Sequence, residues 1–123
     1  MFHILVVEDD GNARKLMKAV LERAEYSVST AEHGEAALAL LDTQHIDLIV
    51  LDVMMPGMDG YALTTELRQS GSVIPILMVT AKQLPADKKK GFLVGTDDYM
   101  TKPVDTEEML LRIKALLRRS RIV

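Results

Sequence analysis

Five side chains spread along the chain have the chemical types needed for phosphoryl transfer. They are two neighbouring acids, a third acid, a hydroxyl and an ammonium group: Glu8, Asp9, Asp52, Thr80 and Lys102. Each follows or ends a short apolar run, which is where a buried parallel strand would end. Because the carboxyl ends of such strands face one crevice, we expect the five side chains to lie together. Carboxylates that hold Mg²⁺, beside a hydroxyl and a cation, are suited to magnesium-assisted phosphoryl transfer.

Apolar runs alternate with helical patterns five times along the chain. Strands are predicted at Ile4–Val7, Ile46–Leu51 and Ile74–Val79, with weaker candidates at Tyr26–Thr30 and Asp98–Met100. Helices are predicted around Leu16–Arg23 and Ala37–Leu41, and over Tyr61–Arg68, Ala86–Val94 and Thr106–Arg119. This alternation predicts one α/β domain of (βα)5 type, with a parallel five-stranded sheet covered by helices on both faces. The expected strand order is 2-1-3-4-5, as in flavodoxin-like folds.

The composition excludes several classes of protein. The chain has 123 residues, of which 48% are hydrophobic and 27% charged, as is ordinary for one soluble domain. Its net charge of −3 gives no reason to expect that this domain itself binds DNA. It contains no cysteine, so disulfides and thiolate metal sites are excluded. Neither a signal peptide nor an apolar run of about 20 residues is present, so we expect a cytoplasmic protein without a membrane partner.

The acids after the first and third strands are the strongest evidence for a metal site. In the expected strand order these strands are neighbours, which places Glu8, Asp9 and Asp52 close together. Carboxylates in one pocket repel each other unless a cation lies between them, and Mg²⁺ is the hard cation that fits best. The alternative is that such acids are N-caps of the following helices. Capping is a sufficient explanation for Asp10 but explains three successive acids less well.

The remaining polar residues favour phosphoryl chemistry over simple metal storage. Thr80 has a hydroxyl that could donate to a phosphoryl oxygen, and Lys102 has a mobile point charge suited to phosphate. Either residue alone is more often ordinary solvated surface, so the prediction depends on their shared position at strand ends. Asp52 stands alone after its strand and faces the acid pair. It is therefore the best candidate for a nucleophile that forms an aspartyl phosphate.

Four segments closely resemble the receiver domain of two-component response regulators. They are ILVVEDD (4–10), IDLIVLDVMMPGMDGY (46–61), PILMVTA (75–81) and GTDDYMTKP (95–103). The resemblance spans nearly the whole chain and implies a CheY-like form of the fold, with 1–123 as one receiver domain. It also implies Mg²⁺ as cofactor, with Asp9 and Asp52 as direct ligands. The backbone carbonyl of Met54 would be a further ligand, and Glu8, which replaces the commoner Asp, would act through water.

The resemblance further implies a signalling mechanism. A partner histidine kinase would donate a phosphoryl group to Asp52, and the domain would catalyse only its own phosphorylation and dephosphorylation. Thr80 and Tyr99 would form the switch pair that responds to phosphorylation of Asp52. The alternative for Tyr99 is that it is only an aromatic residue at the edge of the core. Lys102 would bind the phosphoryl group, and its peptide bond to Pro103 would be cis.

Charged residues near the end of the chain resemble the dimer face of OmpR/PhoB-type receivers. The set comprises Lys88, Asp97, Asp98, Glu108, Arg112 and Arg119. By analogy Lys88 would pair with Glu108, and Asp98 with Arg112, across a homodimer formed by the fourth helix, fifth strand and fifth helix. The alternative is a solvated charged surface, because exposed ion pairs contribute only about 0–1 kcal/mol each.

The basic end of the chain has two interpretations. Residues 118–123 could be the start of a linker to an absent C-terminal DNA-binding domain, or cations that favour a helix C-terminus. A stand-alone receiver that acts through protein contacts is the alternative to an attached effector domain.

Other functions fit the residues less well. A flavin-binding electron carrier would need a phosphate loop where the chain has Glu8–Asp10, and aromatic residues make up only 4% of the chain. A phosphatase of the haloacid dehalogenase type would need an acid where Met54 stands. A degenerate receiver used only for docking would not need to retain every phosphorylation residue.

Overall fold

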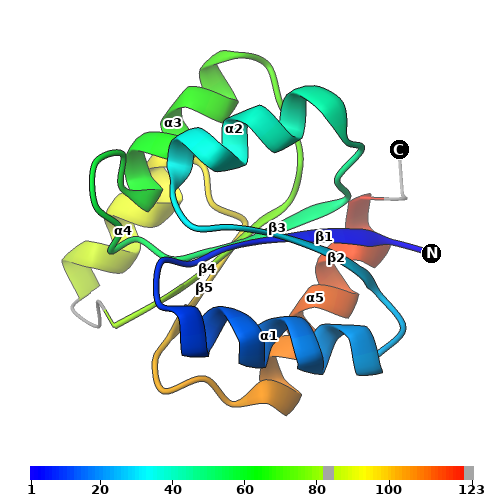
Figure 1. Ribbon diagram of the computed structural model, residues 1–123. Coiled ribbons are helices and arrows are strands. Elements are labelled where there is room, and N and C mark those ends of the chain that lie inside the picture. Colours follow the sequence, from blue (N-terminus) through cyan, green and yellow to red (C-terminus); the bar gives the residue numbers. More distant parts are fainter. Residues whose placement is uncertain (82–84, 121–123) are drawn as a thin grey trace.

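The computed structural model is an open parallel sheet of five strands with helices on both faces (Figure 1). It describes residues 1–81 and 85–120. The elements alternate as β1 (His3–Val7), α1 (Gly11–Arg23), β2 (Ser27–Ala31), α2 (Gly34–Thr43), β3 (Leu48–Leu51), α3 (Gly60–Gln69), β4 (Ile76–Thr80), α4 (Pro85–Val94), β5 (Asp98–Thr101) and α5 (Thr106–Ser120). The strand order β2-β1-β3-β4-β5 is the one predicted, and every neighbouring pair is parallel.

Two apolar layers form the core, one on each face of the sheet. Helices α2, α3 and α4 cover one face, and α1 and α5 cover the other (Figure 1). Successive side chains of a strand point to opposite faces. Leu5 and Val7 therefore pack beneath α2 and α3, whereas Ile4 and Val6 pack beneath α1 and α5. Burial on both faces explains why the central strands read as continuous apolar runs.

Local sequence determines most element positions, with small differences from the prediction. The third and fourth strands begin two residues later than predicted, because Ile46 is buried without strand pairing and Pro75 precedes β4. The first helix is confirmed, but it buries Met17 and Leu21, and Leu16 is 57% exposed. Met17 and Leu21 lie one helical turn apart and face the layer of Ile4 and Val6, and Val20 packs partly against the same layer.

The last helix buries the stripe that the sequence indicates. Met109, Ile113, Leu116 and Leu117 are buried, and Leu110 packs against them. Arg118, Arg119 and Ser120 form the last turn of α5, and residues 121–123 lie outside the described part. Among residues 1–81 and 85–120, no helix combines the length and apolar character needed to cross a membrane.

A close backbone approach connects the end of β3 to the start of α3. The Gly60 amide donates to the Val53 carbonyl at 2.9 Å. A Cβ on Gly60 would lie 2.5 Å from the Asp52 carbonyl oxygen and 2.7 Å from the Val53 Cα. Only glycine fits this position without a backbone shift, so the start of α3 is packed directly against the backbone of Asp52.

Replacing Gly60 with Ala should lower the free energy of unfolding by about 2 kcal/mol, because backbone atoms must move to admit the methyl group. Urea denaturation followed by circular dichroism measures the loss. Gly11→Ala is the matched control, because its new Cβ would meet only the Arg14 Nη2 atom at an ordinary 3.7 Å. We expect that variant to be neutral or more stable by under about 1 kcal/mol. Equal losses in both variants would contradict this explanation.

Candidate functional site at the carboxyl edge of the sheet

The structure brings the predicted acids to one edge of the sheet. Glu8 and Asp9 follow β1, and Asp52 follows the neighbouring strand β3. Each of these side chains offers a carboxylate oxygen, and the three oxygens lie within 4.8 Å of one another. Glu8 is 1% exposed and Asp52 5% exposed, whereas Asp9 lies open to solvent. An all-oxygen donor set with one exposed member fits a hard divalent cation such as Mg²⁺.

Lys102 joins the two buried acids. Its Nζ atom lies 2.7 Å from Glu8 Oε1 and 2.9 Å from Asp52 Oδ2. Burial alone lowers the pKa of Lys102, but the hydrogen bonds to Glu8 and Asp52 outweigh it, so this pKa is raised. Burial raises the pKa of Glu8 to about 7, and the nearby charge of Asp52 adds to the rise against the hydrogen bond from Lys102. The cation therefore screens two carboxylates that would otherwise repel each other.

The loop after β1 is held by Arg14, a residue that the sequence reasoning missed. Its Nη1 atom donates to the Glu8 carbonyl at 2.9 Å and to the Asp9 carbonyl at 3.3 Å. Its Nη2 atom lies 3.4 Å from Glu32 Oε1 in the loop after β2. Asp10 accepts from the Ala13 amide at 3.0 Å and caps α1, so the capping interpretation is correct for Asp10.

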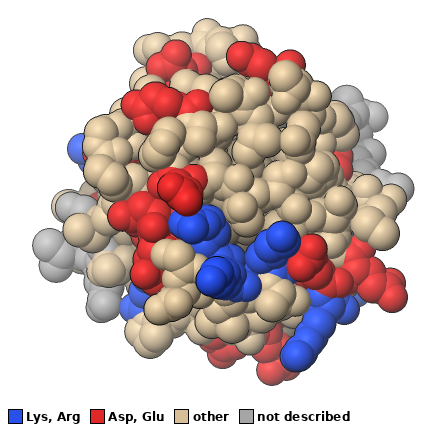
Figure 2. Space-filling view, in the orientation of Figure 1, with Lys and Arg blue, Asp and Glu red and all other residues tan. Residues whose placement is uncertain are grey.

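Acidic and basic side chains around this loop also form separate groups on the surface. Acidic side chains gather at the edge where β1 runs into α1, and basic side chains lie along α1 beside them (Figure 2). The only signal in the sequence for Arg14 was its place one helical turn after the acids.

The other predicted residues lie in β4, β5 or the loops at the same edge of the sheet. The Met54 amide donates to Asp52 Oδ1 at 3.0 Å and fixes the carboxylate, while the ligand role of the Met54 carbonyl stays a prediction. Thr80 ends β4 and is fully buried, and Tyr99 in β5 is 5% exposed. The peptide bond between Lys102 and Pro103 is cis, as the resemblance implied.

Comparison with known proteins decides the family. A family model described as the response regulator receiver domain matches residues 4–114. The chain belongs to this family. It is the receiver domain of a two-component response regulator. The fold predicted from the sequence is confirmed, because solved receiver structures share it. The receiver domain of the Francisella response regulator 1452 superimposes with a TM-score of 0.94 at 32% identity, covering 98% of this chain and 99% of that one.

Curated relatives of this receiver are transcriptional regulators of the OmpR/PhoB type. The alkaline phosphatase synthesis transcriptional regulatory protein PhoP of Bacillus subtilis (strain 168) is 50% identical over 97% of this chain and 50% of its own length. The transcriptional regulatory protein ResD of the same strain is 45% identical over 95% of this chain and 48% of its own length. The receiver therefore spans about half the length of these relatives.

Of the six residues predicted for a dimer face, three pair with one another inside this receiver. Arg112 Nη1 donates to both carboxylate oxygens of Asp98, at 3.0 and 2.8 Å, and Nη2 lies 3.0 Å from Glu108 Oε1. These hydrogen bonds raise the pKa of Arg112. Lys88 on α4 and Arg119 on α5 are exposed. Pairing of these residues across two subunits stays a prediction.

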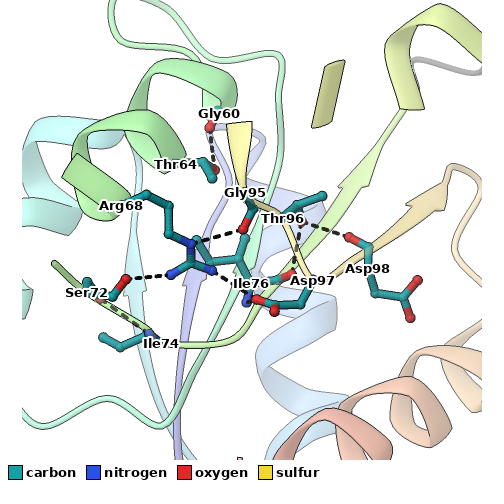
Figure 3. Close-up of polar contacts among 10 residues, drawn as sticks. All are labelled: Gly60, Thr64, Arg68, Ser72, Ile74, Ile76, Gly95, Thr96, Asp97 and Asp98. Atoms are coloured by element: carbon teal, nitrogen blue, oxygen red, sulfur yellow. Dashed lines mark hydrogen bonds and ion pairs between the residues drawn. The ribbon is translucent and has the colours of Figure 1, made fainter. Parts of the chain in front are cut away.

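Asp97 has an internal role that the sequence did not indicate. Figure 3 shows Arg68 of α3 bound at three points: its Nη2 atom lies 2.9 Å from Asp97 Oδ2, and it also donates to the carbonyls of Gly95 and Ser72, each at 3.0 Å. The same Asp97 oxygen accepts from the Ile76 amide at 2.8 Å. Arg68 and Asp97 thus join α3, β4 and β5 at the edge opposite the acids.

Arg68→Met should lower the free energy of unfolding by about 1–3 kcal/mol, because Asp97 loses its cationic partner and the Gly95 and Ser72 carbonyls lose the Arg68 donor. Arg112→Met is the matched control and should cost about 0–1 kcal/mol, because the Arg112 side chain is 38% exposed against 23% for Arg68 and pairs with side chains that water can reach. Thermal and urea denaturation of both variants provide the comparison. A larger loss of unfolding free energy in Arg112→Met than in Arg68→Met would show that the Arg68 network of Figure 3 contributes less to stability than the ion pairs of Arg112.

Proposed function

We propose that this receiver takes a phosphoryl group from the phosphohistidine of a sensor histidine kinase onto Asp52, with Mg²⁺ bound in the acid pocket. The observation that carries the proposal is the convergence of Glu8, Asp9 and Asp52 within 4.8 Å, with Lys102 on two of them. Asp9, Asp52 and the Met54 carbonyl would hold the metal directly, and Glu8 through water. When charged, the acids and the lysine leave two net negative charges, which one divalent cation balances.

The proposed reaction is a displacement at phosphorus. One carboxylate oxygen of Asp52 forms a bond to phosphorus, and the bond from phosphorus to the histidine nitrogen breaks with its electron pair left on the imidazole. Bound Mg²⁺ would supply positive charge to the phosphoryl oxygens. The Met54 amide orients the carboxylate, and Lys102 can turn from Asp52 to a phosphoryl oxygen without leaving the pocket. Hydrolysis of the aspartyl phosphate would end the signal, so the domain catalyses only its own modification.

The response would pass through Thr80 and Tyr99 to the surface formed by α4, β5 and α5. Phosphorylation would then favour one of two conformations, and a homodimer through Lys88, Asp97, Asp98, Glu108, Arg112 and Arg119 would follow. The curated relatives are about twice as long as this receiver and are named as transcriptional regulators. Their length favours an attached DNA-binding domain over a stand-alone receiver, and the whole protein would work in the cytoplasm.

Incubation with Mg²⁺ and acetyl phosphate should add the mass of one phosphoryl group to this receiver. Asp52→Asn should gain none, because an amide cannot attack phosphorus in the same way. Intact-protein mass spectrometry measures both. Asp59→Asn is a useful control, because Asp59 caps α3 and Asn caps equally well.

Two results would count against this assignment. Stable labelling of the Asp52→Asn protein would place the phosphoryl group on another residue. If no variant is labelled although calorimetry verifies Mg²⁺ binding, the receiver would be one that docks to partners and is not phosphorylated by this donor.

Mg²⁺ should stabilise the folded receiver, by about 2.7 kcal/mol at a concentration 100-fold above Kd. Asp9→Asn should remove most of this gain, because Asp9 is the exposed acid at the pocket mouth. Asp10→Asn removes the same charge one residue later but keeps the α1 cap, so it should retain the gain. Urea denaturation with and without Mg²⁺ distinguishes the variants. Equal loss in both would indicate a diffuse charge effect instead of a site.

A further inference from the structure

Helix α4 faces the sheet with its smallest residue. Gly91 is the only buried residue of Pro85–Val94, and Val94, at the end of the helix, is partly buried. The larger apolar side chains lie outward, with Phe92 51% exposed and Leu93 86% exposed. A helix on a sheet ordinarily buries an apolar stripe. Here α4 meets the sheet at a position without a side chain, so its backbone can lie close to the strands beneath it.

The strand residues beneath Gly91 are Tyr99 and Met78, which are direct neighbours in the parallel pairing of β4 and β5. A Cβ on Gly91 would lie 3.0 Å from Cδ2 and 3.1 Å from Cε2 of Tyr99, and 3.3 Å from Sδ of Met78. These separations are shorter than the usual carbon–carbon contact of about 3.5–4.0 Å. A side chain at position 91 would therefore require one of the neighbours to shift by a few tenths of an ångström.

The two neighbours of Gly91 differ in how easily they can shift. Met78 has an unbranched side chain whose sulfur can move by rotation about single bonds. The two Tyr99 atoms belong to a rigid ring that is 5% exposed and packs in the apolar layer beneath α2 and α3. A rigid ring in a densely packed layer must turn as a whole. The orientation of Tyr99 is therefore more sensitive than Met78 to a side chain at position 91.

Two contacts with Tyr61 of α3 hold α4 in this position. The Tyr61 hydroxyl donates at 3.0 Å to the carbonyl of Asp87, which lies one helical turn before Gly91. The ammonium group of Lys90, which directly precedes Gly91, lies 4.6 Å from the centre of the Tyr61 ring, within cation–π range. Both contacts oppose a movement of α4 away from the sheet near Gly91. A side chain at position 91 should then displace the Tyr99 ring rather than the helix.

We propose that Gly91 is a positioning residue of the switch: the absence of a side chain at this position lets the Tyr99 ring lie buried beneath α4. The inference rests on the proposed function, because it takes Tyr99 as a residue that responds to phosphorylation of Asp52. A methyl group at position 91 destabilises the buried orientation of the ring more than the exposed one. The population of Tyr99 then shifts toward the exposed orientation before any phosphoryl group arrives.

The first test is the solvent exposure of the Tyr99 ring in Gly91→Ala. The chain has three tyrosines, so selectively labelled rings give three NMR signals, assigned by Tyr→Phe replacement at each position. We expect a soluble paramagnetic probe to broaden the Tyr99 signal several-fold more in Gly91→Ala than in the parent. Gly11→Ala is the matched control, because its new Cβ would meet only the Arg14 Nη2 atom at 3.7 Å, and it should leave the Tyr99 signal unchanged.

A second test asks whether the Tyr99 ring itself is the obstacle. Alanine has a higher helix propensity than glycine, so Gly91→Ala should raise the urea midpoint of unfolding once Tyr99→Ala has removed the ring. With the ring present, the same change should lower the midpoint or raise it less. Residues that do not interact have additive effects on stability, so equal midpoint shifts in the two backgrounds would overturn the proposal.

The outcomes separate positioning of Tyr99 from a general effect on stability. Unchanged broadening of the Tyr99 signal in folded Gly91→Ala would overturn the proposal, and so would equal broadening in Gly11→Ala. If Gly91→Ala folds only together with Tyr99→Ala, the ring is the obstacle and the proposal is supported. If it folds in neither background while Tyr99→Ala alone folds, the proposal is wrong.

Mass spectrometry of the parent after acetyl phosphate treatment is run in parallel. Lack of phosphorylation there would count against the proposed function alone, because the broadening and midpoint comparisons use unphosphorylated protein.

Discussion

The pairing of two buried carboxylates with one lysine is the interaction on which this architecture depends. Glu8 and Asp52 are almost completely removed from water, and like charges at that depth are costly without a cation. The cation comes from the end of β5, which β4 separates from β3, so a long side chain must reach across one strand. The pairing therefore depends jointly on the strand order, on the apolar run before each polar residue and on the length of the lysine side chain. The same pocket is left short of positive charge, which suits it for a divalent ion.

The rigidity of the fold is distributed unevenly around this pocket. At the opposite edge Arg68 joins α3 to the loops before β4 and β5 through three hydrogen bonds, and Asp97 extends this network to the Ile76 amide of β4. Among residues 1–81 and 85–120, the polar contacts of helix α4 with α3 are those of the Asp87 carbonyl and the Lys90 ammonium group, both with Tyr61. A domain with one edge joined by such a network can change its surface locally elsewhere while its sheet stays intact.

Much of this could be predicted from sequence, because strand-end positions converge in a parallel sheet whatever the details of packing. The acids, Lys102 and the strand order follow from that rule, and Asp10 follows from the rules of helix capping. The internal role of Asp97 could not be predicted, since its partner Arg68 lies 29 positions away and any exposed acid would look the same. The buried face of α1 did not follow from its helical pattern alone, because Leu16 and Met17 are both apolar neighbours and only the packing of the core turns Met17 inward. The contacts of Tyr61 with α4 gave no signal at all, since they depend on how two separate helices pack in the folded chain.

The placement of Tyr61 and Tyr99 beside α4 has an optical consequence. The chain has no tryptophan, so its near-ultraviolet absorbance and emission come mainly from three phenol rings. Two of those three lie beside α4, where the Tyr61 hydroxyl donates to the Asp87 carbonyl and the Tyr99 ring packs against Gly91, and the third, Tyr26, lies in the other layer. Phenol emission is sensitive to hydrogen bonding to a carbonyl and to a nearby ring. The unlabelled protein therefore has a built-in chromophore at the junction where its sheet meets helix α4.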